Sequence, residues 1–103
     1  MTADQDLVDL VEVTSRLRVA LDGIHGKLRA ADAILLAGFE RRTRLRAVIV
    51  ARAMRDLGWE QGRCRFNGML ESAYSRGSAL EREVILDVAR GDDDRLVVKR
   101  SEP

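Results

Sequence analysis

The stretch that decides the fold runs from residue 43 to residue 77 and reads TRLRAVIVARAMRDLGWEQGRCRFNGMLESAYSRG. Its first part repeats apolar residues at the three- and four-residue spacing of a helix buried along one face. These residues are Ala47, Val50, Ala53, Met54 and Leu57. Thr43 can cap the start of such a helix, because its hydroxyl accepts a hydrogen bond from a free amide, and Gly58 can end it. We therefore predict a helix over residues 43–57.

The opposite face of this predicted helix is basic. At about 100° per residue, a narrow arc carries Arg41, Arg44, Arg52 and Arg55. Arg41 joins this arc only if the helix begins before Thr43. No acidic residue on this face can pair with the arginines at i,i+4 spacing, so the four like charges repel one another. A polyanion would relieve that repulsion, while an ordinary solvated face of an amphipathic helix is the alternative interpretation.

A β-hairpin is predicted after this helix, over residues 59–76. Asn67-Gly68 is the strongest short-range signal for a hairpin, because both central residues of a type I′ turn need positive φ. The two-residue turn places Phe66 opposite Met69, and side chains then alternate between the two faces of the ribbon. One face is expected to carry Trp59, Arg63, Arg65, Leu70, Tyr74 and Arg76.

The rest of the chain is divided by glycines. Helical spacing predicts helices over residues 3–22 and 27–37, each followed by a glycine that can end it. The C-terminal quarter supports two interpretations. A capping box followed by apolar residues at i+4 spacing favours a helix over residues 79–90. The alternation of apolar and polar residues instead supports strands around 83–89 and 95–100. We favour the helix, so the predicted fold is mainly α with a small β-hairpin, in the α+β class.

Composition and charge narrow the classes of function. The 103 residues fit one domain, and 46% hydrophobic residues exclude a chain that is disordered by composition. The longest uncharged stretch near the middle, Ala33–Phe39, is far shorter than the roughly 20 residues that a membrane helix needs. The net charge is only +1, yet residues 41–65 contain eight arginines against Asp56 and Glu60. This local concentration predicts a surface that faces an anion.

Candidate catalytic and metal-binding residues are few. His25 is the only histidine and Cys64 the only cysteine, so a cysteine-rich zinc site is excluded and no partner spacing points to a triad. Asp92–Asp94 lacks the ligand pattern of an EF-hand and is expected to form a solvated turn. We therefore expect a protein without catalytic residues, cofactors, metals or a small-molecule substrate. The absence of a signal sequence at the start predicts a cytoplasmic location without membrane contact.

The order of predicted elements resembles a winged helix-turn-helix domain, with extra elements at both ends. Residues 30–77 also resemble the winged-helix segment near the C-terminal end of phage- and plasmid-encoded primase-helicases of the virulence-associated-E type. The shared features are Leu57-Gly58-Trp59 after the arginine-rich helix, Arg63-Cys64-Arg65, Asn67-Gly68 and Tyr74-Ser75-Arg76-Gly77. The likeness covers about half the chain. No P-loop is present, so the ATPase part of such helicases is missing.

The resemblance implies a DNA-binding module, in which the third helix enters the major groove and the hairpin reaches the backbone. We expect one domain over residues 1–103, with an acidic helix at 1–26, a winged-helix core at 27–77 and an extension at 78–103. The expected partner is duplex DNA rather than a single strand, with a homodimer also open. The expected contact residues are Arg41, Arg42, Arg44, Arg52, Arg55, Arg63, Arg65, Tyr74 and Arg76. The alternative function is an adaptor or inhibitor of phage type, which would dock through the acidic helix or tail.

Overall fold

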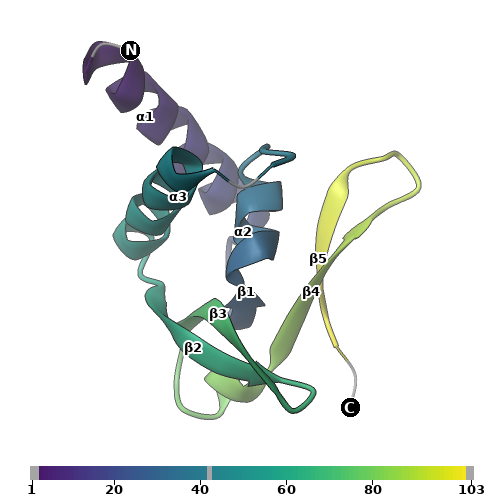
Figure 1. Cartoon of the computed structure of the whole chain (residues 1–103). Helices are drawn as coiled ribbons and strands as arrows, with labels where there is room; N and C mark the ends of the chain where they lie inside the picture. The colour runs from purple at the N-terminus through teal and green to yellow at the C-terminus, as the bar shows by residue number, and fades with distance from the viewer. Residues whose placement is uncertain (1–2, 42, 102–103) are drawn as a thin grey trace.

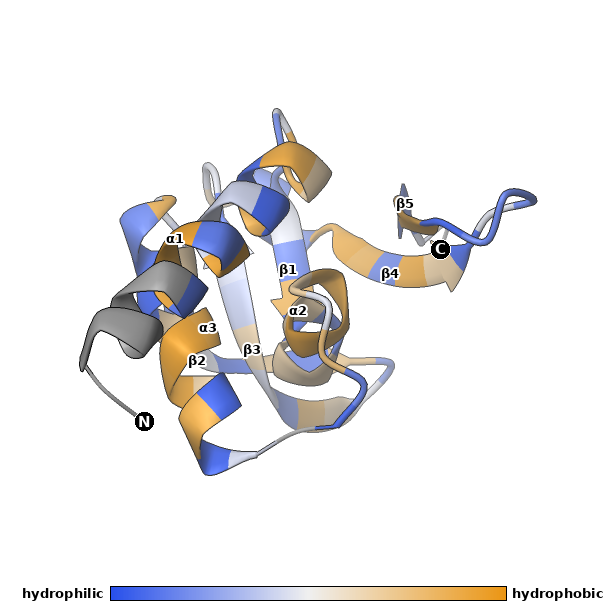
Figure 2. Cartoon of the chain, turned by 90° about the horizontal axis from the view of Figure 1, so that it is seen from above, coloured by the Kyte–Doolittle hydropathy of each residue, from blue (hydrophilic) through white to orange (hydrophobic). Residues whose placement is uncertain are grey.

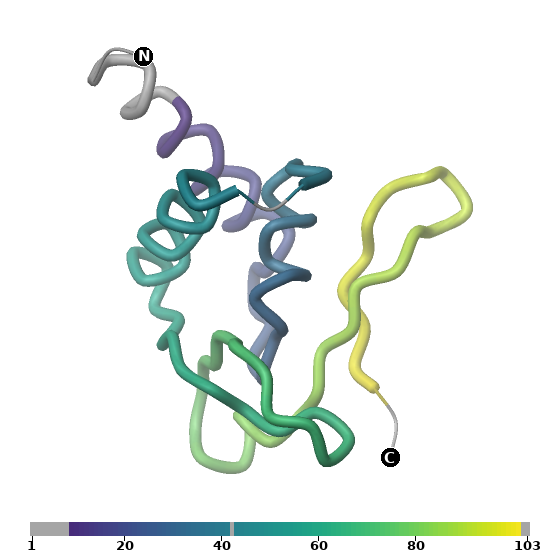
Figure 3. Tube along the Cα trace, in the orientation of Figure 1, coloured from purple at the N-terminus to yellow at the C-terminus, as the bar shows by residue number. Residues whose placement is uncertain are grey.

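Three α-helices, a short 3-10 turn and five strands follow one another in the computed structural model, which describes residues 3–41 and 43–101, with side chains from Asp9 onward (Figures 1 and 3). In chain order they are α1 (Ala3–Ala20), β1 (Gly26–Arg29), α2 (Ala30–Leu36), α3 (Arg44–Asp56), β2 (Glu60–Phe66), β3 (Met69–Arg76), η1 (Glu81–Glu83), β4 (Ile85–Arg90) and β5 (Leu96–Arg100).

The five strands form one mixed sheet in the order β2-β3-β1-β4-β5. The short central strand β1 pairs antiparallel with β3 and parallel with β4. Leu28 lies beside Tyr74 on β3 and beside Leu86 on β4, and all three side chains are buried. Because neighbouring side chains on adjacent strands point to the same face, this row forms the sheet side of the core.

The helices supply the other side of the core. Leu17 and Leu21 in and just after α1, together with Val50 and Met54 from α3, are almost fully buried and belong to the same cluster as Leu28. Burial of one such side chain contributes roughly 1.5–3 kcal/mol. In Figure 2 the β4–β5 hairpin extends away from the helices, so most of the core lies between the helices and the β2-β3-β1 part of the sheet.

The structure confirms the long N-terminal helix, the arginine-rich helix and the first hairpin. Thr43 caps α3 as predicted, with its hydroxyl accepting a hydrogen bond from the Arg46 amide at 3.2 Å. The hairpin has the predicted register, in which Phe66 faces Met69. Asn67 and Gly68 have φ of 53° and 85°, which are the positive values that a type I′ turn requires.

The predicted helix over residues 27–37 is wrong in its first turn. Residues 26–29 form β1, and α2 begins only at Ala30. The backbone of these residues gains sheet partners on both sides, from β3 and β4. Those pairings span 44 residues of sequence or more, so they outweigh a helical pattern that is purely local.

The predicted helix over residues 79–90 is also wrong, and the alternative hairpin is confirmed. The capping box does form, with the Ser78 amide donating to Glu81, but it closes only the 3-10 turn η1. From Ile85 the chain is extended, because β4 joins the edge of β1 and buries Leu86. Strand β5 then pairs with β4, from Leu86 opposite Arg100 to Arg90 opposite Leu96.

The α+β class is confirmed, although the sheet has five strands where a small hairpin was predicted. Since β4 pairs directly with β1, the C-terminal extension shares the sheet of the preceding residues. Across the described residues, no helix combines the length and the apolar character needed to cross a bilayer.

Candidate nucleic-acid interface

An open groove of about 1030 Å³ lies along the exposed side of α3 and reaches the start of β2. From α3, the side chains of Arg44, Val48, Arg52 and Arg55 line it, and from the hairpin those of Glu60 and Gln61. We call this surface the α3 groove. It forms because the other face of α3 is packed on the core through Val50, Ala53 and Met54, while the chain turns at Gly58 to start the sheet.

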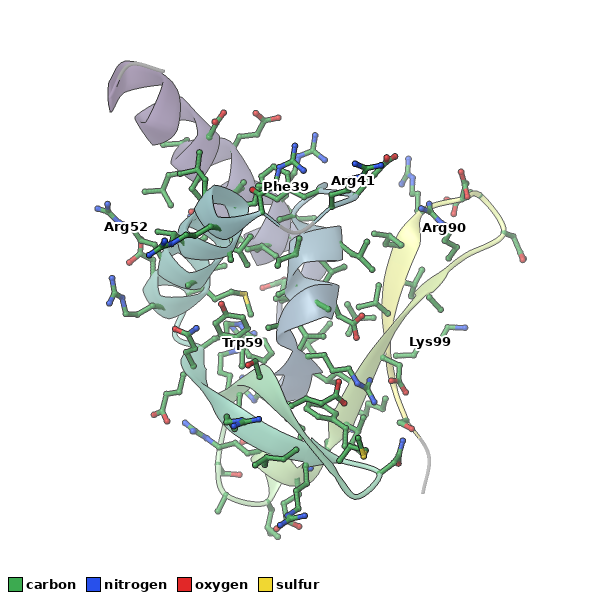
Figure 4. All side chains as sticks on the ribbon, viewed as in Figure 1. Phe39, Arg41, Arg52, Trp59, Arg90 and Lys99 are labelled. Carbon is green, nitrogen blue, oxygen red and sulfur yellow. The ribbon has the colours of Figure 1, made fainter. Side chains whose placement is uncertain are left out.

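The arginines of the α3 groove project into solvent without internal partners. Arg44, Arg52 and Arg55 are exposed, and none of them has a carboxylate within ion-pair distance among the described residues. Figure 4 shows Arg52 pointing away from the body of the molecule. Three guanidinium groups on one helix face therefore keep their full hydrogen-bonding capacity for an external anion.

Two further free arginines extend this basic surface onto the hairpin. Arg63 and Arg65 are exposed on β2, and no carboxylate in the described part of the chain pairs with either. They alternate with Cys64 and so share a strand face with Gln61, which lines the α3 groove. Since β2 is an edge strand, the outer side of this row stays open.

Glu60, the acidic residue that lines the groove, is paired with an arginine. Glu60 accepts two hydrogen bonds from the Arg82 guanidinium, at 2.8 and 3.3 Å. These hydrogen bonds, and then the charge of Arg82, hold the pKa of Glu60 below its usual value. Glu60 therefore stays ionised, but its charge is offset by Arg82, and the arginines set the sign of the potential in the groove.

Arg41 does not join the α3 face. Helix α3 begins at Arg44, after its cap, so Arg41 lies on the preceding loop and points away from Arg52 in Figure 4. Its carbonyl accepts a hydrogen bond from Arg46, whose guanidinium also lies over the Phe39 ring. Arg42 lies outside the described residues.

Arg76, which was expected to contact DNA, is partly buried and is held by contacts within the protein. Its guanidinium donates hydrogen bonds to the carbonyls of Leu21, Ile24 and Leu57 and stacks on the Trp59 ring at 4.6 Å. Burial lowers the pKa of Arg76, and the charge of Asp22 partly offsets this. Four of its five N–H donors are used in joining three chain segments, so Arg76 has little hydrogen-bonding capacity left for a phosphate.

Tyr74, the other expected contact residue on β3, is buried rather than on the surface. Its side chain is only 3% exposed and belongs to the core beside Leu28. Stacking on a base would require the core to open. Trp59, between α3 and β2, is also buried: it is 2% exposed, and its indole Nε1 has no hydrogen-bond partner within the described structure.

A second charged cluster surrounds Arg29 at the end of β1, and its charges are paired with one another. Arg29 pairs with Glu71 at 3.2 Å and with Asp87 at 2.9 Å, and it stacks on the Phe66 ring. Burial lowers the pKa of Arg29, but the hydrogen bonds to the two carboxylates outweigh it and raise the pKa. Asp32 nearby has a raised pKa, chiefly from burial. This arginine therefore ties β1 to its neighbours.

The remaining candidates for chemistry are accounted for by local contacts. His25 Nδ1 lies 2.6 Å from Glu81 Oε2, and Arg90 and Arg95 pair with Asp94 and Asp93 in the β4–β5 turn. In the described part of the chain, no three metal-ligating side chains gather into a site. The sequence prediction overlooked Val48, although its position four residues after Arg44 places it on the same helix face.

No protein-family model matches the chain, and comparisons with curated proteins and with solved structures found no match.

Proposed function

We propose that this chain is a non-enzymatic, winged-helix protein that binds duplex DNA, with α3 in the major groove and the β2–β3 hairpin as the wing. The proposal is supported by the order of elements α1-β1-α2-α3-β2-β3, in which β1 pairs with the second strand of the hairpin. It is also supported by α3 and the hairpin being joined through the buried Trp59, since the two elements then keep a fixed relative orientation.

The observation that carries the proposal is the separation of the arginines into two groups. Arginines such as Arg29, Arg76 and Arg82 are engaged with internal carboxylates or carbonyls. Those left without carboxylate partners in the described structure include five around one surface: Arg44, Arg52, Arg55, Arg63 and Arg65. Unpaired guanidinium groups in such density suit a regular polyanion, because the bidentate fork matches phosphate and the guanine edge.

Duplex DNA fits this surface better than a single strand. Single-strand binding commonly uses exposed aromatic side chains as stacking platforms. Here Trp59 and Tyr74 are buried in the core. A helix with a convex basic face matches the width of the major groove instead. The likeness of residues 30–77 to the primase-helicase segment favours replication or regulation of phage or plasmid DNA, in the cytoplasm, as the setting.

The test compares two double variants of the same charge. Arg52→Ala with Arg55→Ala removes two arginines of the α3 groove, and Arg90→Ala with Arg95→Ala removes two exposed arginines of the distant β4–β5 hairpin. Binding to a labelled duplex is measured by fluorescence anisotropy at about 0.1 M salt. The first variant should bind at least about tenfold more weakly, because charge-assisted hydrogen bonds contribute roughly 1.5–3 kcal/mol each. Equal affinities of the two folded variants would exclude the α3 groove as the binding surface.

The alternative, an adaptor that docks on a protein, is favoured by one feature of α1. Val11 and Val19 are 64% and 77% exposed, and Val19 borders an open groove of about 500 Å³ against Leu35 and Leu96. Light scattering on the anisotropy sample separates the two functions. A stoichiometric complex with itself or another protein, without a DNA complex at low salt, would support the adaptor.

A further inference from the structure

Val48 lines the α3 groove and is 60% exposed. It lies one helical turn after Arg44 and one turn before Arg52, so a basic side chain flanks it on either side along the helix. Ala47 and Ala51 line the same groove. The α3 side of the groove is therefore lined by small apolar side chains as well as by arginines.

The small side chains decide how closely another surface can approach. Alanine has a single methyl group as its side chain, whereas valine carries two methyl groups on its Cβ, so Val48 is the largest apolar side chain that α3 contributes to the groove. The arginines one turn before and after it have longer side chains. A bound surface would meet the guanidinium groups first and then press on the valine. Because Val48 is β-branched, its two methyl groups are held in one preferred rotamer in a helix.

Fold stability does not account for a valine at this position. Valine is a weaker helix former than alanine, and its exposed methyl groups remain in water. Val48 is 60% exposed in this structure, so more than half of its surface stays in water. A partner that buries Val48 must therefore offer an apolar group within an otherwise anionic surface.

Duplex DNA offers one such group in the major groove, the C5-methyl of thymine. On the proposed function that places α3 in this groove, we infer that Val48 contacts thymine methyl groups and selects A·T pairs at the centre of the site. Arg44, Arg52 and Arg55 would bind the flanking phosphates or guanine edges. The protein would then prefer particular DNA sequences, in addition to its attraction to the phosphate backbone of DNA.

The experiment replaces thymine by deoxyuridine, which keeps base pairing and removes only the methyl group. A preferred duplex is first selected from a random library with the full chain. Its thymines are then changed to uracil, and affinity is measured at fixed salt. We expect about a fourfold loss for each contacted methyl, in line with the burial of one such group. Val48→Ala should bind the thymine and uracil duplexes equally.

A matched variant controls for effects of uracil on DNA shape. Val19→Ala removes the same atoms from an exposed position on α1, outside the groove, and should keep the full preference for thymine. Circular dichroism confirms that both variants fold.

The outcomes separate this inference from the proposed function. Salt-dependent DNA binding with equal affinity for thymine and uracil duplexes overturns the inference and leaves the proposed function standing. A thymine preference that persists in Val48→Ala, or a selected site without thymine, also overturns it. Absence of any DNA complex at low salt refutes the proposed function and the inference together.

Discussion

At the scale of single residues, Arg76 shows how one guanidinium can hold three chain segments together. It bridges the end of α1, the loop before β1 and the end of α3 through the carbonyls of Leu21, Ile24 and Leu57. Its planar group also lies flat on Trp59. The three segments leave carbonyls facing one point, and one five-donor side chain satisfies them all.

Arg76→Ala should therefore destabilise the fold strongly. Each buried carbonyl left without a donor costs about 1–3 kcal/mol, so we expect a loss of roughly 3 kcal/mol or more in the free energy of unfolding. Urea denaturation followed by tryptophan fluorescence measures this directly. Arg63→Ala, at an exposed position on β2, should change stability by less than about 0.5 kcal/mol. Equal midpoints for the two variants would show that the bridge contributes nothing.

Glu81 should make the stability of the fold sensitive to acid. The Ser78 amide donates to its carboxylate, and His25 lies against it, so these contacts lower the pKa of Glu81 to about 2. The pKa in the unfolded chain is the ordinary 4.5. The ionised form therefore stabilises the fold above pH 4.5, and this contribution is lost as the pH falls toward 2.

Glu81→Gln should lower the melting temperature at pH 6 and flatten its decline between pH 4.5 and 2. Melting curves recorded across this range give the result. Glu83→Gln, at an exposed position in the same turn, should keep the slope of the wild-type chain. An unchanged slope in Glu81→Gln would mean that other carboxylates cause the acid sensitivity.

Local spacing predicted which arginines lie on the exposed face of α3, because a helix repeats its geometry regularly. It could not predict that Arg76 is internal. That outcome depends on three carbonyls from segments up to 55 residues away, and no local pattern records where they meet. The same holds for Tyr74, whose burial depends on β1 lying beside it.

At the scale of elements, β1 is the strand that the sequence pattern concealed. Its four residues continue directly into α2, so apolar residues spaced for one helix run through both elements. The decisive residue is Gly26, whose φ is +151°. A Cβ there would lie 2.7 Å from the Val84 carbonyl oxygen and 2.9 Å from Leu86. The close approach of β1 to β4 therefore requires glycine.

Gly26→Ala should weaken the joint between the core and the β4–β5 hairpin. The new methyl group must push β4 away or strain β1, at a cost of about 1–3 kcal/mol. Gly62→Ala provides the matched control, because no atom lies within 4 Å of its added Cβ and its φ is not positive. Hydrogen exchange should show faster opening of β4 and β5 in the first variant only. Equal protection in both variants would refute the steric argument.

The C-terminal hairpin shows a related limit of prediction. Val84, Leu86 and Val88 fit either a helix or a strand when the segment is considered alone. The free edge of β1 decides between the two, since β4 satisfies its backbone groups and buries Leu86 at 1% exposure. Deleting residues after Gly77 would therefore remove part of the core along with the acidic turn.

At the scale of the whole molecule, acidic and basic residues gather in different places, although the net charge is only +1. The acidic turn Asp92–Asp94 lies at the far end of the β4–β5 hairpin, well away from α3 (Figure 1). Within that turn, Asp93 and Asp94 pair with neighbouring arginines. Screening shortens the reach of exposed charges to about 10 Å at 0.1 M salt. The α3 groove therefore presents its own positive potential, whatever the net charge of +1.

The salt dependence of DNA binding should report this local charge. If the five free arginines of α3 and β2 each neutralise a phosphate, the plot of log affinity against log salt should have a slope of about −4.5, since each contact contributes about −0.9. Arg52→Ala with Arg55→Ala should reduce the magnitude of that slope by about 2, while Arg90→Ala with Arg95→Ala should leave it unchanged. Anisotropy titrations between about 50 and 300 mM KCl give the slopes. Equal slopes for both double variants would mean that attraction follows net charge, and the α3 groove would then have no special part in binding.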